Sequence, residues 1–274
     1  MIKPSGGRVV AIASGKGGVG KTNIAVNVAV ALARLGLRVG VLDADFGLGN
    51  VDVLLGLTPT LHLGHVLAGE KALHEIMLDG PCGIRVAPAS SGIRELTALT
   101  AVHRGRLRDA VQQLRAELDF LVIDTASGIS ANVLESILLA ERALIVTSLE
   151  PAAVVDAYAM TKVLTAMAPH LELGVVVNAV RSAEEGSLAY RQIEIASGRF
   201  LKRSLRYFGF IADDPAVREA VLGQRSIVEH LPQSPASRCF RVLASRLAGL
   251  GPTSGHSLDV SCPAGDAEEV SRCA

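Results

Sequence analysis

The sequence predicts an α/β fold, a mostly parallel sheet covered by helices on both faces. Two observations predict it. Short apolar runs rich in β-branched residues alternate with longer stretches of helical periodicity. The short runs are apolar throughout, as in strands that are buried on both faces. Strands of an antiparallel sheet with one face in water would instead alternate apolar and polar residues. Both patterns indicate βαβ units.

The first strand is predicted over residues 8–13, followed by a glycine-rich turn and an alanine-rich helix over 23–35, which Gly36 ends. The second strand is residues 38–42. Further strands are predicted at 84–87, 120–123, 142–147, 173–178 and 207–211. Further helices are predicted at about 105–117, 130–139, 154–167, 187–202 and 238–250.

Composition excludes several classes of protein. The 274 residues carry 27 basic and 27 acidic side chains, so no overall field attracts nucleic acid or anionic lipid. Hydrophobic residues make up 49%, enough for a large core. The four cysteines form no C-x-x-C pair, and the N-terminal run is too short and interrupted for a signal peptide or membrane span. We expect a soluble, cytoplasmic protein with reduced thiols.

One domain is predicted over residues 1–250, because no linker or repeat divides them. Residues 251–274 hold four acidic side chains against one arginine and show no apolar period. This composition is typical of disorder, so we expect a disordered C-terminal tail.

A phosphate-binding loop follows the first predicted strand and opens the first helix. The pattern G-x-x-x-x-G-K-[ST] is met by Gly15, Lys16, Gly17, Gly18, Val19, Gly20, Lys21 and Thr22. Glycines let successive backbone N–H groups face an anion at the helix N-terminus. Lys21 is then expected to reach the β- and γ-phosphates, and the Thr22 hydroxyl to bind Mg²⁺. The sequence therefore predicts a P-loop nucleotide site.

Carboxylates follow two of the predicted strands. Asp43 and Asp45 come after the second strand, and Asp124 ends the strand at 120–123. The carboxyl ends of parallel strands line the ligand crevice, so one carboxylate can approach Mg²⁺ and another can orient a water for attack on the γ-phosphate. The alternative for Asp43 and Asp45 is that they cap a turn.

The loop, with Lys16 at its second position, resembles the deviant Walker A motif xKGGxGK[ST] of the MinD/ParA ATPases. The resemblance implies that Lys16 reaches across a dimer to the partner's nucleotide, and that Asp45 positions the attacking water. It also implies Mg²⁺ near Thr22, Asp43 and Asp124, with the segment 125–128 as switch II. The implied activity is slow hydrolysis of ATP to ADP and phosphate.

The resemblance extends to the adenine side of the site. Asn178 stands where the family places an asparagine that reads the base, although capping of the strand end is an equal alternative on the residues alone. Ala212 and Asp213 match the family's second adenine-side segment, with Ala212 in place of the customary proline. We expect all three near the base.

Several stretches resemble the flagellar-number regulators of this family, the FlhG/FleN (YlxH) branch, more than MinD. They are residues 43–57, 87–96, 124–130 and 150–162. This implies an ATP-dependent homodimer that acts on a flagellar transcriptional activator and an FlhF-like GTPase. Many FlhG proteins stimulate that GTPase through an N-terminal DQAxxLR segment; here seven residues precede the first strand, so stimulation is not predicted.

Two surfaces leave alternatives open. The helix at 238–250 carries an apolar face with arginines at its edges, which suits attachment to the inner face of the membrane, but packing on the sheet is the favoured interpretation. A basic cluster could bind DNA, but a solvated helix face is favoured. The cluster is Arg199, Lys202, Arg203 and Arg206.

Other functions remain as alternatives to the flagellar one. They are a MinD-type regulator of the division site and a ParA-type ATPase that partitions DNA or cargo. An iron protein of the nitrogenase-reductase type is excluded, because it needs a cysteine in the switch II region and residues 125–130 contain none.

Overall fold

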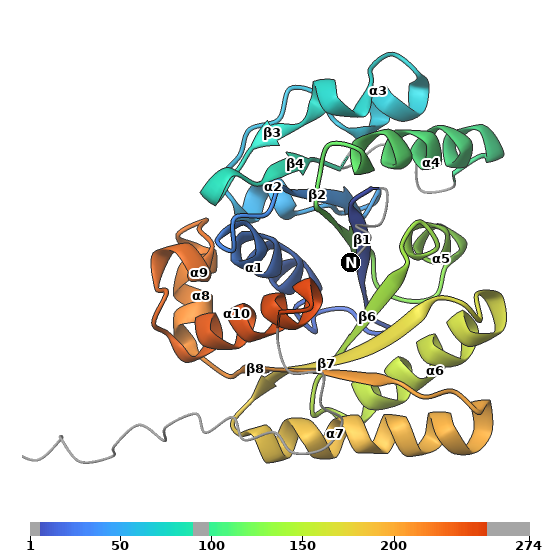
Figure 1. The fold of residues 1–274 in the computed structure, drawn as a ribbon, viewed down its shortest axis with the longest axis vertical. Helices are drawn as coiled ribbons and strands as arrows, with labels where there is room; N and C mark the ends of the chain where they lie inside the picture. Colours follow the sequence, from blue (N-terminus) through green and yellow to red (C-terminus); the bar gives the residue numbers. More distant parts are fainter. Residues whose placement is uncertain (1–5, 90–98, 251–274) are drawn as a thin grey trace, which may run out of the picture.

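The computed structural model describes residues 6–89 and 99–250, and within them the chain forms one eight-stranded sheet (Figure 1). The strand order is β3-β4-β2-β5-β1-β6-β7-β8, and every pair is parallel except β3 with β4. The strands are β1 (Arg8–Ala13), β2 (Val39–Ala44), β3 (Leu78–Asp79), β4 (Arg85–Ala87), β5 (Phe120–Thr125), β6 (Arg142–Thr147), β7 (Glu172–Val180) and β8 (Arg206–Ala212). The predicted fold class is confirmed.

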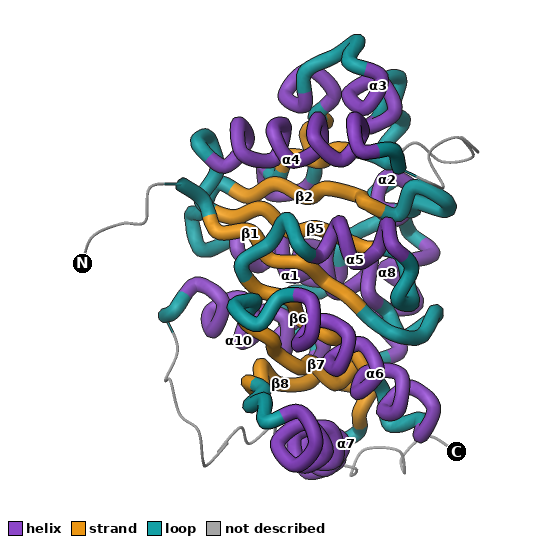
Figure 2. Tube along the Cα trace, turned by 90° about the vertical axis from the view of Figure 1, so that its right-hand side faces the viewer, coloured by secondary structure: helices purple, strands orange, loops and turns teal. Residues whose placement is uncertain are grey.

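Helices cover both faces of the sheet, as Figures 1 and 2 show from two sides. One face carries α1 (Lys21–Ala33), α8 (Pro215–Leu222), α9 (Ile227–His230) and α10 (Pro235–Ala248). The other carries α3 (Leu63–Ala68), α4 (Ala101–Arg115), α5 (Ala131–Ile137), α6 (Pro151–Met167) and α7 (Ala183–Ala196). The short helix α2 (Val51–Leu54) follows β2, and single turns η1 (Leu73–Ile76), η2 (Pro81–Gly83) and the π-helical η4 (Ser197–Leu201) complete the elements.

The core lies in two layers, one on each face of the sheet. Along β1, Val9 and Ala11 belong to the layer under α5 and α6, whereas Val10 and Ile12 belong to the layer under α1. All four side chains are at most 2% exposed. This is the two-sided burial that the continuous apolar runs predict.

Helix α10 packs as an ordinary last helix. Its apolar face, with Phe240, Leu243 and Leu247 at 1–2% exposure, lies against α1 and β8, while Leu250 is 71% exposed. The face considered for membrane attachment is therefore part of the core. None of the helices described is long and apolar enough to cross a bilayer.

The sequence placed several boundaries wrongly. Helix α1 begins at Lys21 and not at residue 23, because the phosphate loop runs directly into its first turn. Strands β2 and β5 extend to Ala44 and Thr125, so Asp43 and Asp124 lie inside strands. Strand β7 continues through Asn178 to Val180. Helices α2, α3, α8 and α9 and strand β3 were not predicted. The predicted tail at 251–274 and most of the stretch 87–96 lie outside the described residues.

Candidate nucleotide-binding site

The phosphate loop connects β1, near the middle of the sheet, to α1. Gly18 and Gly20 have φ values of 77° and 91°, a left-handed conformation that favours glycine. A Cβ on Gly15 would lie 2.4 Å from the carbonyl oxygen of Asp156 in α6. Glycine at these positions gives the loop its curvature and lets α6 pack directly against it.

Hydrogen bonds from three segments hold the loop backbone. The Ser14 hydroxyl donates to the Lys16 carbonyl over 2.7 Å. The Gly128 N–H in the switch II segment donates to the Ser14 carbonyl over 2.9 Å. From β7, the side-chain Nδ2 of Asn178 donates to the Val19 carbonyl over 2.8 Å. Three hydrogen bonds within the chain thus hold the loop backbone.

Lys21 lies in the first turn of α1 with only 9% of its surface exposed. Burial lowers the pKa of its ammonium, and the nearby carboxylates of Asp124 and Asp45 oppose that shift. A cation held beside the backbone N–H groups of a helix N-terminus suits a polyphosphate.

Asp43 in β2 and Asp124 in β5 are register partners on adjacent strands, and both are buried. Burial raises the pKa of Asp43 to about 7, although backbone N–H groups of Val51 and Asp45 donate to its carboxylate and oppose the shift. Burial, with the charge of Asp43 as the second cause, raises the pKa of Asp124 to about 8. Two like charges this deep favour a ligand that brings positive charge.

The side chains here fit Mg²⁺. Asp124 accepts a hydrogen bond from Thr22, while its Oδ1 is buried without a partner. Carboxylate and hydroxyl oxygens are ligands that Mg²⁺ prefers, together with phosphate oxygens and water. No group of three or more His, Cys, Asp or Glu side chains in the described part of the chain could hold a metal alone. Thr22, Asp43 and Asp124 are the residues that would hold Mg²⁺ here, and this assignment stays a prediction.

Asp45 caps the turn after β2. Its Oδ1 accepts from the N–H groups of Gly47 and Leu48 over 3.2 and 3.0 Å. The turn-capping alternative therefore describes what Asp45 does here, and its other oxygen, Oδ2, is the one that a water-orienting role would use. That catalytic role stays a prediction.

Lys16 lies at the rim of the loop and forms an ion pair with Glu150, the residue that precedes α6. The two side chains are 36% and 66% exposed. The ammonium is thus held at the surface, beside the start of α6. An exposed pair of this kind is worth about 0–1 kcal/mol, so it opposes release of Lys16 only weakly.

The three residues predicted to lie near the base, Asn178, Ala212 and Asp213, are found toward the C-terminal ends of the neighbouring strands β7 and β8. Strand β8 ends at Ala212, and the Asp213 N–H donates to the Val180 carbonyl over 2.8 Å. Asn178 does not cap the end of a strand; its amide faces the phosphate loop. This contact between β7 and the loop was missed, because residues so distant in sequence share no local pattern.

Three of the four side chains of the basic cluster contact other parts of the chain. Arg203 donates to the carbonyls of Pro169 and Leu171, and Arg206 pairs with Glu172 over 3.6 Å. Arg199 stacks over the Phe200 ring. These contacts agree with the solvated helix end and leave fewer free cations for a DNA backbone.

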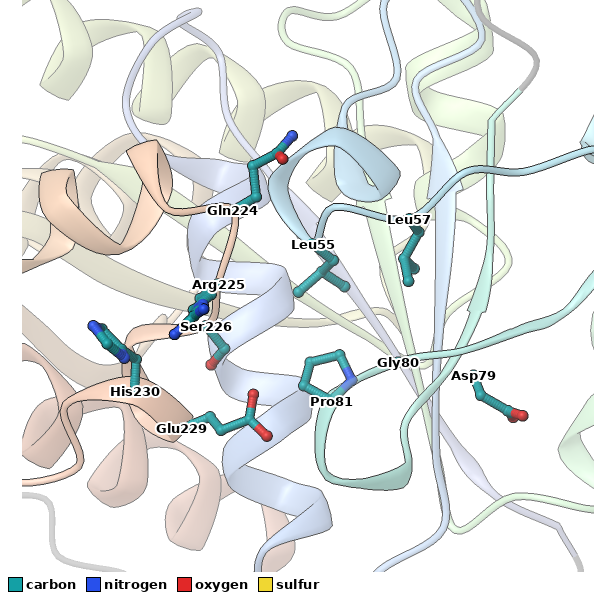
Figure 3. A pocket seen from close by; sticks show the side chains of 10 residues that line it. All are labelled: Leu55, Leu57, Asp79, Gly80, Pro81, Gln224, Arg225, Ser226, Glu229 and His230. Carbon is teal, nitrogen blue, oxygen red and sulfur yellow. The ribbon is translucent and has the colours of Figure 1, made fainter.

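A cavity of about 580 Å³ lies elsewhere, between the segment after α2, the η2 turn and the α8–α9 loop (Figure 3). It is lined by Leu55, Leu57, Asp79, Gly80, Pro81, Gln224, Arg225, Ser226, Glu229 and His230. None of these residues belongs to the phosphate loop or to the carboxylate cluster, so this cavity is not the nucleotide site.

Comparison with known proteins identifies the family of the chain. The ParA family model, described as an NUBPL iron-transfer P-loop NTPase, matches residues 6–248. The chain belongs to the ParA/MinD family of P-loop NTPases. The antiactivator FleN of Pseudomonas aeruginosa is 42% identical over 240 residues, covering 88% of this chain and 86% of that protein. The flagellum site-determining protein YlxH of Helicobacter pylori is 31% identical, covering 88% and 81%.

Solved structures of this family share the fold. The cell-division ATPase MinD of Pyrococcus furiosus superposes with a TM-score of 0.77 at 27% identity, covering 89% of this chain and all of that one. MinD of Pyrococcus horikoshii, solved with Mg-ADP, gives 0.76 at 25% identity, covering 89% and 96%. The resemblance to the MinD/ParA family, and to its flagellar FleN/YlxH branch, is confirmed.

Proposed function

We propose that this chain is an ATP-dependent dimerisation switch that regulates flagellar number and placement, as a FleN/YlxH-type member of its family. The observation that carries the proposal is the buried cluster of Lys21, Asp43 and Asp124 directly beside a preformed phosphate loop. Such a cluster gains most from a ligand that supplies both negative phosphates and a divalent cation.

Each residue of the site has a distinct role in hydrolysis. The loop N–H groups and Lys21 bind the phosphates and stabilise the charge that develops on them. Thr22, Asp43 and Asp124 would hold Mg²⁺, which would supply positive charge to offset the charge of the phosphates. The free oxygen of Asp45 orients a water toward the γ-phosphate. Asp45 is fixed by its turn, so that this oxygen is held in place beforehand.

The switch depends on Lys16. In the ATP-bound state Lys16 leaves Glu150 and reaches the nucleotide of a second copy, so that the dimer forms on ATP and dissociates after hydrolysis. Its exposure at the rim of the loop supports this role, since a buried lysine could not reach another chain. One exposed ion pair must break for each subunit.

The names of two relatives support the choice of partners in this proposal. FleN is an antiactivator and YlxH a flagellum site-determining protein, which suit a transcriptional activator and an FlhF-like GTPase as partners. A MinD complex with MinC is solved for Aquifex aeolicus, so a relative of this fold recruits a protein partner. The buried face of α10 and the occupied arginines disfavour membrane and DNA surfaces at those two places.

Hydrolysis of ATP by the purified protein at several concentrations tests this function. If the dimer is the active form, phosphate release per chain rises with protein concentration and then levels off. Lys21→Ala should release none. A constant rate per chain across a hundredfold range of concentration would contradict the dimer switch, and the absence of any hydrolysis by the wild type would contradict the ATPase.

A further inference from the structure

Asn178 lies at an irregularity in β7. The pairing of β7 with β8 shifts between Val177 and Val180, and Ala179 has a φ of 54°. A left-handed alanine costs about 1 kcal/mol relative to a regular strand. The backbone at Ala179, next to Asn178, is therefore less stable than that of a regular strand. Bulges of this kind commonly change the direction of a side chain.

The Asn178 carboxamide points into the phosphate loop. Its Nδ2 donates to the Val19 carbonyl over 2.8 Å, and a Cβ built on Gly20 would lie 2.3 Å from the same nitrogen. Val19 and Gly20 directly precede Lys21. Since a carbonyl oxygen only accepts, the group that faces it must be the amide nitrogen.

We propose that Asn178 is a positioning residue for the phosphate loop, through the hydrogen bond from its amide nitrogen to the Val19 carbonyl. This inference rests on the proposed binding of ATP and adds a role distinct from reading adenine. A carboxamide has one acceptor oxygen and two donor hydrogens, so Oδ1 can accept from the exocyclic amine of the base while Nδ2 holds the loop. One side chain then links base recognition to the placement of Lys21.

The test compares two nucleotides that differ only at the base amine. Asn178→Ala is titrated calorimetrically with ATP and with purine riboside triphosphate, which lacks the exocyclic amine. Loss of the bond to the loop should weaken purine riboside triphosphate about tenfold, the size of one hydrogen bond, and should weaken ATP at least as much, because ATP also loses the contact between Oδ1 and the base amine. Gln192→Ala removes an exposed carboxamide on α7 and serves as the matched control, with no change expected.

A second variant separates the two roles of the carboxamide. Asn178→Asp keeps an acceptor for the base amine but sets a carboxylate against the Val19 carbonyl. We expect it to bind ATP at least as weakly as Asn178→Ala. In steady state both variants should raise KM for ATP with little change in kcat, because the loop is held equally in the ground and transition states. A purely structural defect would instead lower kcat through loss of active protein.

The outcomes are distinguishable. If Asn178→Ala weakens ATP but leaves purine riboside triphosphate unchanged, or if Asn178→Asp binds ATP like the wild type, the positioning role is wrong and the residue only reads the base. If the wild type binds neither ligand, the proposed function itself fails.

Discussion

At the scale of single residues, the site buries carboxyl groups whose charged form is more stable in water. Asp43 and Asp124 are held side by side in the sheet, and burial disfavours ionisation of both. Two backbone N–H groups and the Lys21 ammonium offset part of that cost. A cation arriving with phosphates would relieve the cost that remains.

The raised pKa values predict a pH dependence of stability. Between about pH 4 and pH 8 the folded state binds more protons than the unfolded one, so the free energy of unfolding falls as pH rises through this range. Each group contributes a slope of about 1.4 kcal/mol per pH unit while it is protonated only in the folded state. Urea unfolding in EDTA at pH 5 to 8 measures it, with Asp43→Asn expected to flatten the slope. Equal slopes for both proteins would contradict the assignment.

Lys21→Ala should abolish ATP binding, because it removes the main cation that faces the phosphates. Without that positive charge, the pKa of Asp124 should rise further, so Asp124 becomes neutral more readily. No unpaired charge is then buried, and the protein should still fold. Calorimetric titration with ATP and Mg²⁺ measures the loss, and circular dichroism confirms the fold. Lys162→Ala, an exposed lysine on α6, is the control and should bind like the wild type. Retained affinity in Lys21→Ala would remove Lys21 from the site.

At the scale of elements, the sequence predicts a helix or strand well when the pattern that specifies it lies within the element itself. The continuous apolar runs predict β1 and β6 to the residue, because burial on both faces imposes that composition. The phosphate loop is predicted from its glycines for the same local reason. The two-residue strand β3 and the four-residue helices α2 and α9 carry no periodicity of their own, and only tertiary contacts form them.

The course of the chain around Asn178 shows the limit of such reasoning. An asparagine after an apolar run predicts a strand end, yet β7 continues to Val180 through a bulge. The side chain of Asn178 donates instead to the carbonyl of Val19, which is 159 positions away in the chain. The ion pair of Lys16 with Glu150 is likewise set by how α6 packs against the loop.

The packing of α10 leads to a stability prediction. Phe240 is 1% exposed against α1, so Phe240→Ala should lower the free energy of unfolding by about 3–5 kcal/mol, the transfer and cavity cost of a buried phenylalanine. Leu222→Ala, at a site 76% exposed on α8, should change it by less than about 0.5 kcal/mol. Chemical denaturation measures both. A Phe240→Ala protein as stable as the wild type would mean that α10 is not part of the core.

At the scale of the whole molecule, a buried site and an exposed lysine together suit a protein that acts in pairs. The residues predicted to hold the nucleotide, Lys21, Asp43 and Asp124, are buried, whereas Lys16 lies at the surface. Lys16→Ala should therefore bind ATP with nearly unchanged affinity but remain monomeric. Sedimentation velocity with ATP and Mg²⁺ measures this, and a dimeric Lys16→Ala protein would exclude the contact between subunits.

The most direct test of the switch is the solution mass by light scattering of wild type and Asp45→Ala, each with ATP–Mg²⁺ and with ADP. Asp45→Ala retains Lys16, Lys21 and the carboxylates of Asp43 and Asp124 but lacks the oxygen that we propose to orient water. The account predicts a dimer with ATP and a monomer with ADP, and a dimer that persists longer in the variant because hydrolysis is slowed. A monomer in every condition would contradict it and assign this phosphate loop to a different reaction.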